Sequence, residues 1–245
     1  MAAQVCSSKR PAAVRRAMKV CRLFQIGQNA WMRDAFQGAV AQLGTDLAAM
    51  SAAGAAAMRH ATRALLEADL PLAEQVLADD ATIDAQRTQC EEHAHSLLAL
   101  QAPVASDLRA VLAAVYCAEK IERMGDLAAH LADTARVAHP SHAVPVDLRD
   151  TVAELGRLTA SMADRLTTSI TAPEPGVFTQ LADIDRTVDD LHAGVLTQIT
   201  DPDFPHGPRA AATLALVTRF YERFADQVVS VARRLDFVTT GELPT

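Results

Sequence analysis

Hydrophobic residues recur at alternating steps of three and four along three stretches of the chain. Near the C-terminus the series is Leu214, Val217, Tyr221, Phe224, Val228, Val231 and Leu235. In the first half it is Ala114, Cys117, Ile121, Met124, Ala128, Leu131 and Ala135. A third series is Leu181, Ile184, Val188, Leu191 and Val195. This spacing predicts long helices with a narrow buried seam of the coiled-coil kind.

The two halves of the chain repeat one another. ERMGDLAAHLADTAR at 122–136 corresponds to ERFADQVVSVARRLD at 222–236. DATID at 80–84 corresponds to DRTVD at 185–189, and VAQLG at 40–44 corresponds to VAELG at 152–156. Repetition at this period predicts two copies of one supersecondary unit.

Proline-rich segments divide each copy into three helices. We expect helices at about 33–69, 72–101 and 107–137, the last capped by Ser106 or Asp107, and then at about 146–171, 176–199 and 208–237. The prediction is an all-α fold, a tandem repeat of two antiparallel three-helix bundles with six long helices. Its expected parts are a leader (1–31), the first bundle (32–138), a linker (139–145), the second bundle (146–237) and a tail (238–245).

Composition supports an all-α fold and limits the kinds of partner and location that we expect. Half of the residues are hydrophobic but only 4% are aromatic, which favours closely packed helices over β-structure. A net charge of −7 indicates no general affinity for nucleic acid or an anionic membrane. The chain contains no apolar run of about 18 residues, so we expect no helix that spans a membrane. Cys6, Cys21, Cys90 and Cys117 lack CxxC spacing, so we expect a cytoplasmic protein with reduced thiols.

The first 31 residues differ from the rest in charge. They contain no acid, and their basic residues are Lys9, Arg10, Arg15, Arg16, Lys19 and Arg22. The segment lacks a clear apolar core, so it is a poor secretory signal. We expect a disordered extension, with Met32 as an alternative start.

Pairs of acids spaced by four residues recur in both halves. They are Asp80 and Asp84, Glu122 and Asp126, Asp185 and Asp189, and Glu222 and Asp226, with Glu119 one turn before Glu122. With the seams in the core, these acids point outward, where a single pair is usually only solvated. Their recurrence favours two surface grooves that bind hard cations such as Mg²⁺, Mn²⁺ or iron. The Glu-x-x-His motifs of a ferritin-like di-iron centre are absent.

The start of the third predicted helix carries an apolar strip outside its seam. The strip consists of Leu108, Val111, Leu112 and Val115, and Asp107 and Arg109 flank it. An outward apolar strip predicts a contact surface, either with the other half or with a partner. The histidines show no ligand spacing.

These motifs together resemble a known family. APVASDLRAVLAAV followed by EKIERMGDLA, and RFYERFADQVVSVARR in the second half, are similar to the phosphate-specific transport system accessory protein PhoU family over about residues 32–236. The resemblance implies a cytosolic negative regulator of the phosphate-starvation response, with no enzymatic activity. It would couple the phosphate ABC transporter, through its ATPase subunit, to a sensor histidine kinase, and it would often form a homodimer.

The resemblance also implies metal clusters on the four acid pairs, with iron or another divalent metal (Mg, Mn or Zn). The halves differ, because Arg219, Ser230 and Arg233 replace Glu119, His130 and Asp133. We therefore expect the first half to bind metal more tightly. The alternatives are a metal-storage protein or metalloenzyme that uses the carboxylate grooves, and a purely structural helical module.

Overall fold

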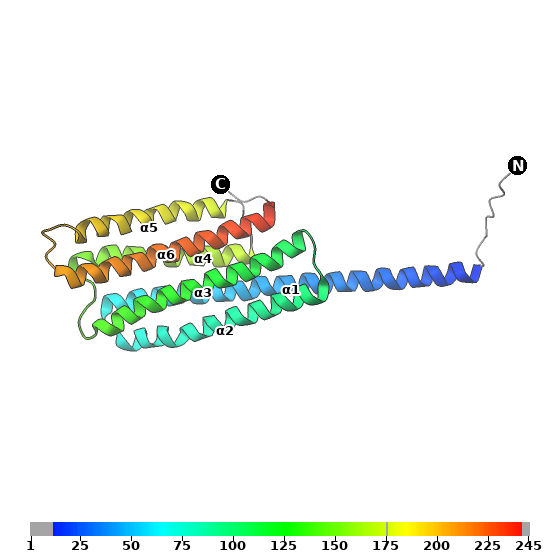
Figure 1. Cartoon of the computed structure of the whole chain (residues 1–245), viewed down its shortest axis with the longest axis horizontal. Helices are drawn as coiled ribbons and strands as arrows, with labels where there is room; N and C mark the ends of the chain where they lie inside the picture. The colour runs from blue at the N-terminus through cyan, green and yellow to red at the C-terminus, as the bar shows by residue number, and fades with distance from the viewer. Residues whose placement is uncertain (1–11, 175, 242–245) are drawn as a thin grey trace. The chain divides into compact units, whose positions relative to one another are not determined.

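A computed structural model describes the backbone of residues 12–174 and 176–241, with side chains from residue 33 onward. The described residues form α1 (Ala12–Glu67), α2 (Leu70–Gln101), α3 (Ser106–Ala138), the short 3-10 helix η1 (Val146–Leu148), α4 (Arg149–Thr171), α5 (Val177–Ile199) and α6 (Gly207–Thr240). The predicted all-α class with six long helices is therefore confirmed (Figure 1). Among these residues, no helix combines the length and hydrophobicity that crossing a membrane requires.

Helix α1 begins earlier than expected. Its backbone is helical from Ala12, inside the segment for which we expected a disordered leader, while residues 1–11 lie outside the described part. Residues 12–31 contain no proline and are rich in strong helix formers, which explains the difference. Residues up to Ala41 belong to a separate unit, and the compact unit Gln42–Thr245 is described below by itself.

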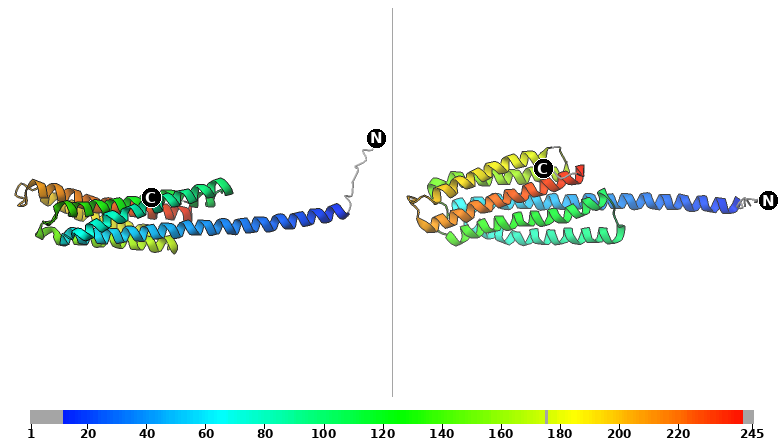
Figure 2. Two further views of the ribbon diagram at one scale, coloured as in Figure 1. Left: turned by 90° about the horizontal axis from the view of Figure 1, so that it is seen from below. Right: turned by 45° about the horizontal axis from the view of Figure 1, so that its top comes forward.

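Four helices of this compact unit lie side by side in the order α2, α3, α6, α5 (Figures 1 and 2). Helix α4 packs against α5 and α6. The α1 residues in this unit contact α4 through a hydrogen bond from Ser51 Oγ to the Ala163 carbonyl (3.3 Å). They contact α6 through the hydroxyls of Thr62 and Tyr221 (2.9 Å). The two repeats thus share one compact unit, and residues 139–145 connect them inside it.

The hydrophobic seams form the core. All of the first-half seam residues are buried, and in α6 only Leu235 is partly exposed. Cys90 and Cys117 are buried free thiols, and burial is the main reason that their pKa values rise to about 11 and about 12. Both are therefore protonated at neutral pH, and the side chains of Cys6 and Cys21 lie outside the described residues.

Two helix starts differ from the prediction. Helix α2 begins at Leu70 because Pro71 is tolerated in the first turn, and Asp69 caps it by accepting a hydrogen bond from the Leu72 amide (3.1 Å). The N-cap of α3 is Ala105, which makes no side-chain capping bond, so the prediction of Ser106 or Asp107 as the cap is wrong. Asp107 lies in the first turn instead, where its negative charge interacts favourably with the positive end of the helix dipole.

Candidate functional site: two acidic clusters

The first acidic cluster lies where α2 packs against α3. Asp80 and Asp84 come from α2, and Glu122 and Asp126 come from α3. Burial raises the pKa of Asp80, and the charges of Asp126 and Asp84 raise it further. The pKa of Glu122 is raised by burial and by the same two carboxylates. The structure therefore brings these four predicted residues close enough for their charges to interact.

Gly125 allows this close packing. A Cβ atom at Gly125 would lie 3.0 Å from Asp80 Oδ1 and 3.0 Å from Ile83 Cδ1. Contacts this short are tighter than those that real Cβ atoms usually make, so a side chain here would require the Asp80 and Ile83 side chains to shift. The glycine in the ERMGD motif thus leaves room for these two side chains of α2.

Cationic groups border the first cluster. The charges of Arg87 and Arg123 lower the pKa of Glu122, partly offsetting the effect of burial. Arg87 also donates a hydrogen bond to Glu91 (2.8 Å). Sequence reasoning missed Arg87, although it lies three residues after Asp84 and hence on the same helix face. His130 lies near Asp80 and stacks on Phe220 of α6, with ring centroids 5.1 Å apart.

The second acidic cluster is the counterpart between α5 and α6. It contains Asp185, Asp189, Glu222 and Asp226. Burial is the largest cause that raises the pKa of Asp185 to about 7, and the charges of Asp189, Asp226 and Glu222 add to it. Two oxygens here, Asp185 Oδ1 and Glu222 Oε2, are buried without a hydrogen-bond partner. Such oxygens are costly unless a cation or proton satisfies them.

The two clusters differ in their cations. Glu222 forms an ion pair with Arg219, the residue that replaces Glu119 in the second repeat. Glu119 itself is exposed, its carboxylate lies 3.9 Å from the Lys120 ammonium, and it does not contribute to the raised pKa values of the first cluster. The structure therefore does not bring Glu119 into the first cluster.

The predicted outward placement of the acids can be compared with their exposure. Asp84, Glu119, Asp189 and Asp226 are exposed, and Asp80, Glu122, Asp126, Asp185 and Glu222 are partly buried. The acids therefore lie outside the fully buried seams, at the edges where the paired helices meet.

The donor chemistry of both clusters fits a hard cation. All of the clustered donors are carboxylates, which suit Mg²⁺, Mn²⁺ or iron. A bound cation would also give the two unpartnered oxygens of the second cluster an interaction partner. In the described part of the chain, however, no three His, Cys, Asp or Glu side chains are arranged as a group that could hold a metal ion. A cation would therefore require rearrangement of these side chains.

The predicted contact strip on α3 is partly corrected. Leu108 and Leu112 are 36% and 53% exposed, and Val115 is partly buried. Val111 is fully buried, so its assignment to an outward strip is wrong. The reason is that α3 packs against both α2 and α6, which buries positions on either side of its seam. Arg109 lies against the end of α6, with Nη2 3.8 Å from the position that a Cβ of Gly241 would occupy.

An all-helical chain of two repeats, each with an acidic cluster between its last two helices, defines a narrow class of protein. The comparison with protein families identifies that class. Residues 47–135 and 152–235 match the family model described as the PhoU domain, and the chain belongs to the PhoU family.

Curated relatives agree with this assignment. The chain is 42% identical to the phosphate-specific transport system accessory protein PhoU homolog 2 of Mycobacterium tuberculosis, over 87% of this chain and 100% of that protein. It is 41% identical to PhoU homolog 1 of Mycobacterium leprae, over 87% of this chain and 96% of that protein.

Solved structures share the fold. The crystal structure of PhoU from Pseudomonas aeruginosa superposes with a TM-score of 0.78 at 23% identity, covering 84% of this chain and 100% of that one. The phosphate transport system regulatory protein PhoU from Streptococcus pneumoniae gives a TM-score of 0.77 at 22% identity, covering 86% and 99%. These likenesses show that the six-helix arrangement is common to the family.

Proposed function

We propose that the chain is a regulatory adaptor of phosphate uptake. It would bind the ATPase subunit of a phosphate ABC transporter and the cytoplasmic part of a sensor histidine kinase, and so restrain the phosphate-starvation response without catalysis of its own. Relatives that match most of this chain are named as accessory proteins of phosphate-specific transport, which supports this role. The proposal includes a cytoplasmic location and a homodimer.

The observation that carries the adaptor role is an exposed apolar surface at the start of α3. Leu108 and Leu112 are exposed there, Leu100 at the end of α2 is 80% exposed, and Val104 on the connection to α3 is 73% exposed. Exposed apolar side chains that gather at one place mark a contact surface. We assign this surface to partner binding.

Substituting Leu112 tests the assignment. We expect the wild-type chain to retain the purified ATPase subunit and the kinase domain in a pull-down, and Leu112→Glu to weaken retention at least about tenfold, because a charge would be buried at the contact. The control is Leu216→Glu on α6, since Leu216 is 58% exposed and lies outside this surface. Retention of neither partner by the wild type, or equal effects of both variants, would contradict the proposal.

We also propose that the acidic clusters bind a divalent cation such as iron, Mg²⁺, Mn²⁺ or Zn²⁺, as part of regulation. Asp80, Asp84, Glu122 and Asp126 would hold it in the first half, and Asp185, Asp189, Glu222 and Asp226 in the second. A bound cation would offset the burial and the mutual repulsion that raise the carboxylate pKa values.

The two halves should differ in cation affinity. We expect Asp84→Ala with Glu122→Ala to remove more bound metal than Asp185→Ala with Glu222→Ala, because Arg219 already neutralises Glu222 and a pKa of about 7 leaves Asp185 half protonated at neutral pH. Elemental analysis of the purified chains measures the difference. Asp79→Ala is the control, since Asp79 is exposed and bonded to Gln75 (2.8 Å). The reverse order of metal loss would refute the expectation.

A further inference from the structure

A surface groove lies between α1 and α4 and uses none of the clustered acids. Its volume is about 470 Å³. Small-molecule sites are commonly clefts of about 300–1,000 Å³ with mostly apolar walls and a few convergent polar groups. One face of α1 contributes Arg59, Thr62 and Arg63 to its lining, and one face of α4 contributes Gly156, Arg157 and Asp164.

The apolar part of the lining, called the floor below, consists of Ala153, Ala160 and Leu66. The two hydroxyls of the lining are already bonded within the protein. Thr62 Oγ1 donates to the Met58 carbonyl (2.8 Å) and contacts the Tyr221 hydroxyl, and Ser161 Oγ donates to the Leu158 carbonyl (2.7 Å). A flat apolar group could therefore lie on this floor without competing for buried hydrogen bonds.

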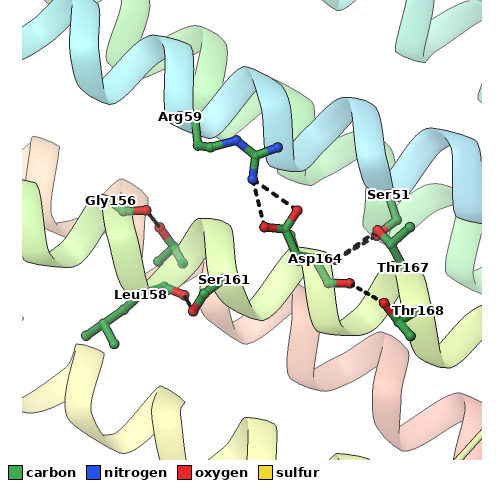
Figure 3. Close-up of polar contacts among 10 residues, drawn as sticks. Ser51, Arg59, Gly156, Leu158, Ser161, Asp164, Thr167 and Thr168 are labelled. Carbon is green, nitrogen blue, oxygen red and sulfur yellow. Dashed lines mark hydrogen bonds and ion pairs between the residues drawn. The ribbon is translucent and has the colours of Figure 1, made fainter.

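Three guanidinium groups border the floor. Arg59 is fixed across the groove, because its Nη1 lies 3.0 and 2.8 Å from the two carboxylate oxygens of Asp164 (Figure 3). Arg157 bonds to Glu154 (2.7 and 2.6 Å), which is on the same helix but does not line the groove.

Arg63 is the guanidinium that is available to a ligand. It is exposed and makes no ion pair or hydrogen bond with any residue of the described ranges 33–174 and 176–241. The lining has three arginines and two acids, Glu67 and Asp164. Because Asp164 and Glu154 pair with Arg59 and Arg157, Arg63 supplies the one cationic group of the lining that no acid of the described ranges holds.

We propose that the α1–α4 groove binds a phosphate-bearing organic anion with a flat apolar part, of the nucleotide class. Arg63 would hold the phosphate groups through paired N–H donors, the geometry in which guanidinium groups recognise phosphate. Arg157 would add a second contact by exchanging its exposed ion pair with Glu154 for the ligand. The floor formed by Ala153, Ala160 and Leu66 would take the flat part. This site goes beyond the adaptor role, since it gives the chain a small-molecule input that needs neither partner.

Isothermal titration of the full chain tests the proposal, with ATP, adenosine and tripolyphosphate as probes and EDTA present. EDTA removes divalent cations, so the acidic clusters cannot hold the nucleotide through a metal. We expect ATP to bind once per chain, at least about tenfold more tightly than either other probe. If tripolyphosphate binds as tightly as ATP, the apolar floor does not contribute to binding. If adenosine binds as tightly as ATP, the phosphate groups do not contribute. Either result, or no ATP binding at millimolar concentration, overturns the proposal.

Matched variants locate the site. Arg63→Gln and Arg157→Gln should each weaken ATP binding about tenfold or more, because each removes a charge-assisted contact. The control is Arg136→Gln on α3, because Arg136 is an exposed arginine bonded to an acid three residues earlier, as Arg157 is. Equal weakening by Arg136→Gln would mean a general charge effect and would overturn the assignment. Unchanged thermal midpoints confirm that the variants fold, and a failure of the adaptor pull-down would not alter these results.

Discussion

Replacing Gly156 with alanine should lower the free energy of unfolding by about 1–3 kcal/mol, the usual cost of overpacking a tight contact. A Cβ at Gly156 would lie 2.9 Å from Thr62 Cβ and closer still to the two γ atoms of Thr62. The direction is informative, because helix propensity alone predicts a gain of about 1 kcal/mol for alanine over glycine. Denaturant unfolding monitored by circular dichroism gives the difference.

A control and a double-mutant cycle test the cause. Gly44 occupies the corresponding place in the first repeat, but no atom lies within 4 Å of a Cβ there, so Gly44→Ala should be neutral or stabilising. Thr62→Ala alone should cost about 1–3 kcal/mol, because the buried Tyr221 hydroxyl loses its partner. In that background, Gly156→Ala should cost less, since the two closest atoms, the γ atoms of Thr62, are gone and only its Cβ remains near. Additive costs would show that Thr62 is not the obstacle.

The second large effect is a dependence of stability on pH that Asp185 causes. Its pKa is about 7 in the folded chain and near 3.8 when free of its surroundings, so the folded state binds more protons between these values. The stabilisation is complete below about pH 4 and is lost as the pH rises through 7. Asp185→Asn should therefore stabilise the metal-free chain at pH 8, by about 1–2 kcal/mol after allowance for solvent screening, with little effect at pH 4.

Thermal unfolding in EDTA between pH 4 and pH 8.5 measures this effect. Asp190→Asn is a suitable control, because Asp190 is an exposed carboxylate on the same helix and does not contribute to the raised pKa of Asp185. A stability profile for Asp185→Asn parallel to that of the wild type would show that the carboxylate ionises as freely in the folded chain as in the unfolded one.

The sequence predicted the seams because helix periodicity repeats locally, and residues such as Ile121 and Phe224 are buried where expected. It did not predict the burial of Val111, because a seam describes one contact and α3 makes contacts with two helices. The start of α3 was missed for another reason. Ala105 precedes it with a φ of 50°, a positive value that residues other than glycine rarely adopt, and nothing in the local sequence indicates it.

The acidic clusters could be predicted from recurrence, because the same pairs appear on the same helices of both repeats. Arg87 could have been added by its spacing from Asp84. The unpartnered oxygen of Asp185 could not be predicted, since it depends on how paired helices bury one another. The α1–α4 groove could not be predicted from the sequence either. Arg63 and Arg157 come from different repeats, and no local spacing indicates that they line one cavity.

The contact between α3 and α6 joins the two repeats as a subunit interface joins a homodimer, with His130 stacked on Phe220 across it. In a homodimer every substitution appears in both subunits, whereas here each repeat is encoded separately. Arg219 could therefore replace the counterpart of Glu119 in one repeat and leave the other unchanged. The chain therefore resembles a covalently linked heterodimer, in which the charges beside one carboxylate cluster can change without changing those beside the other.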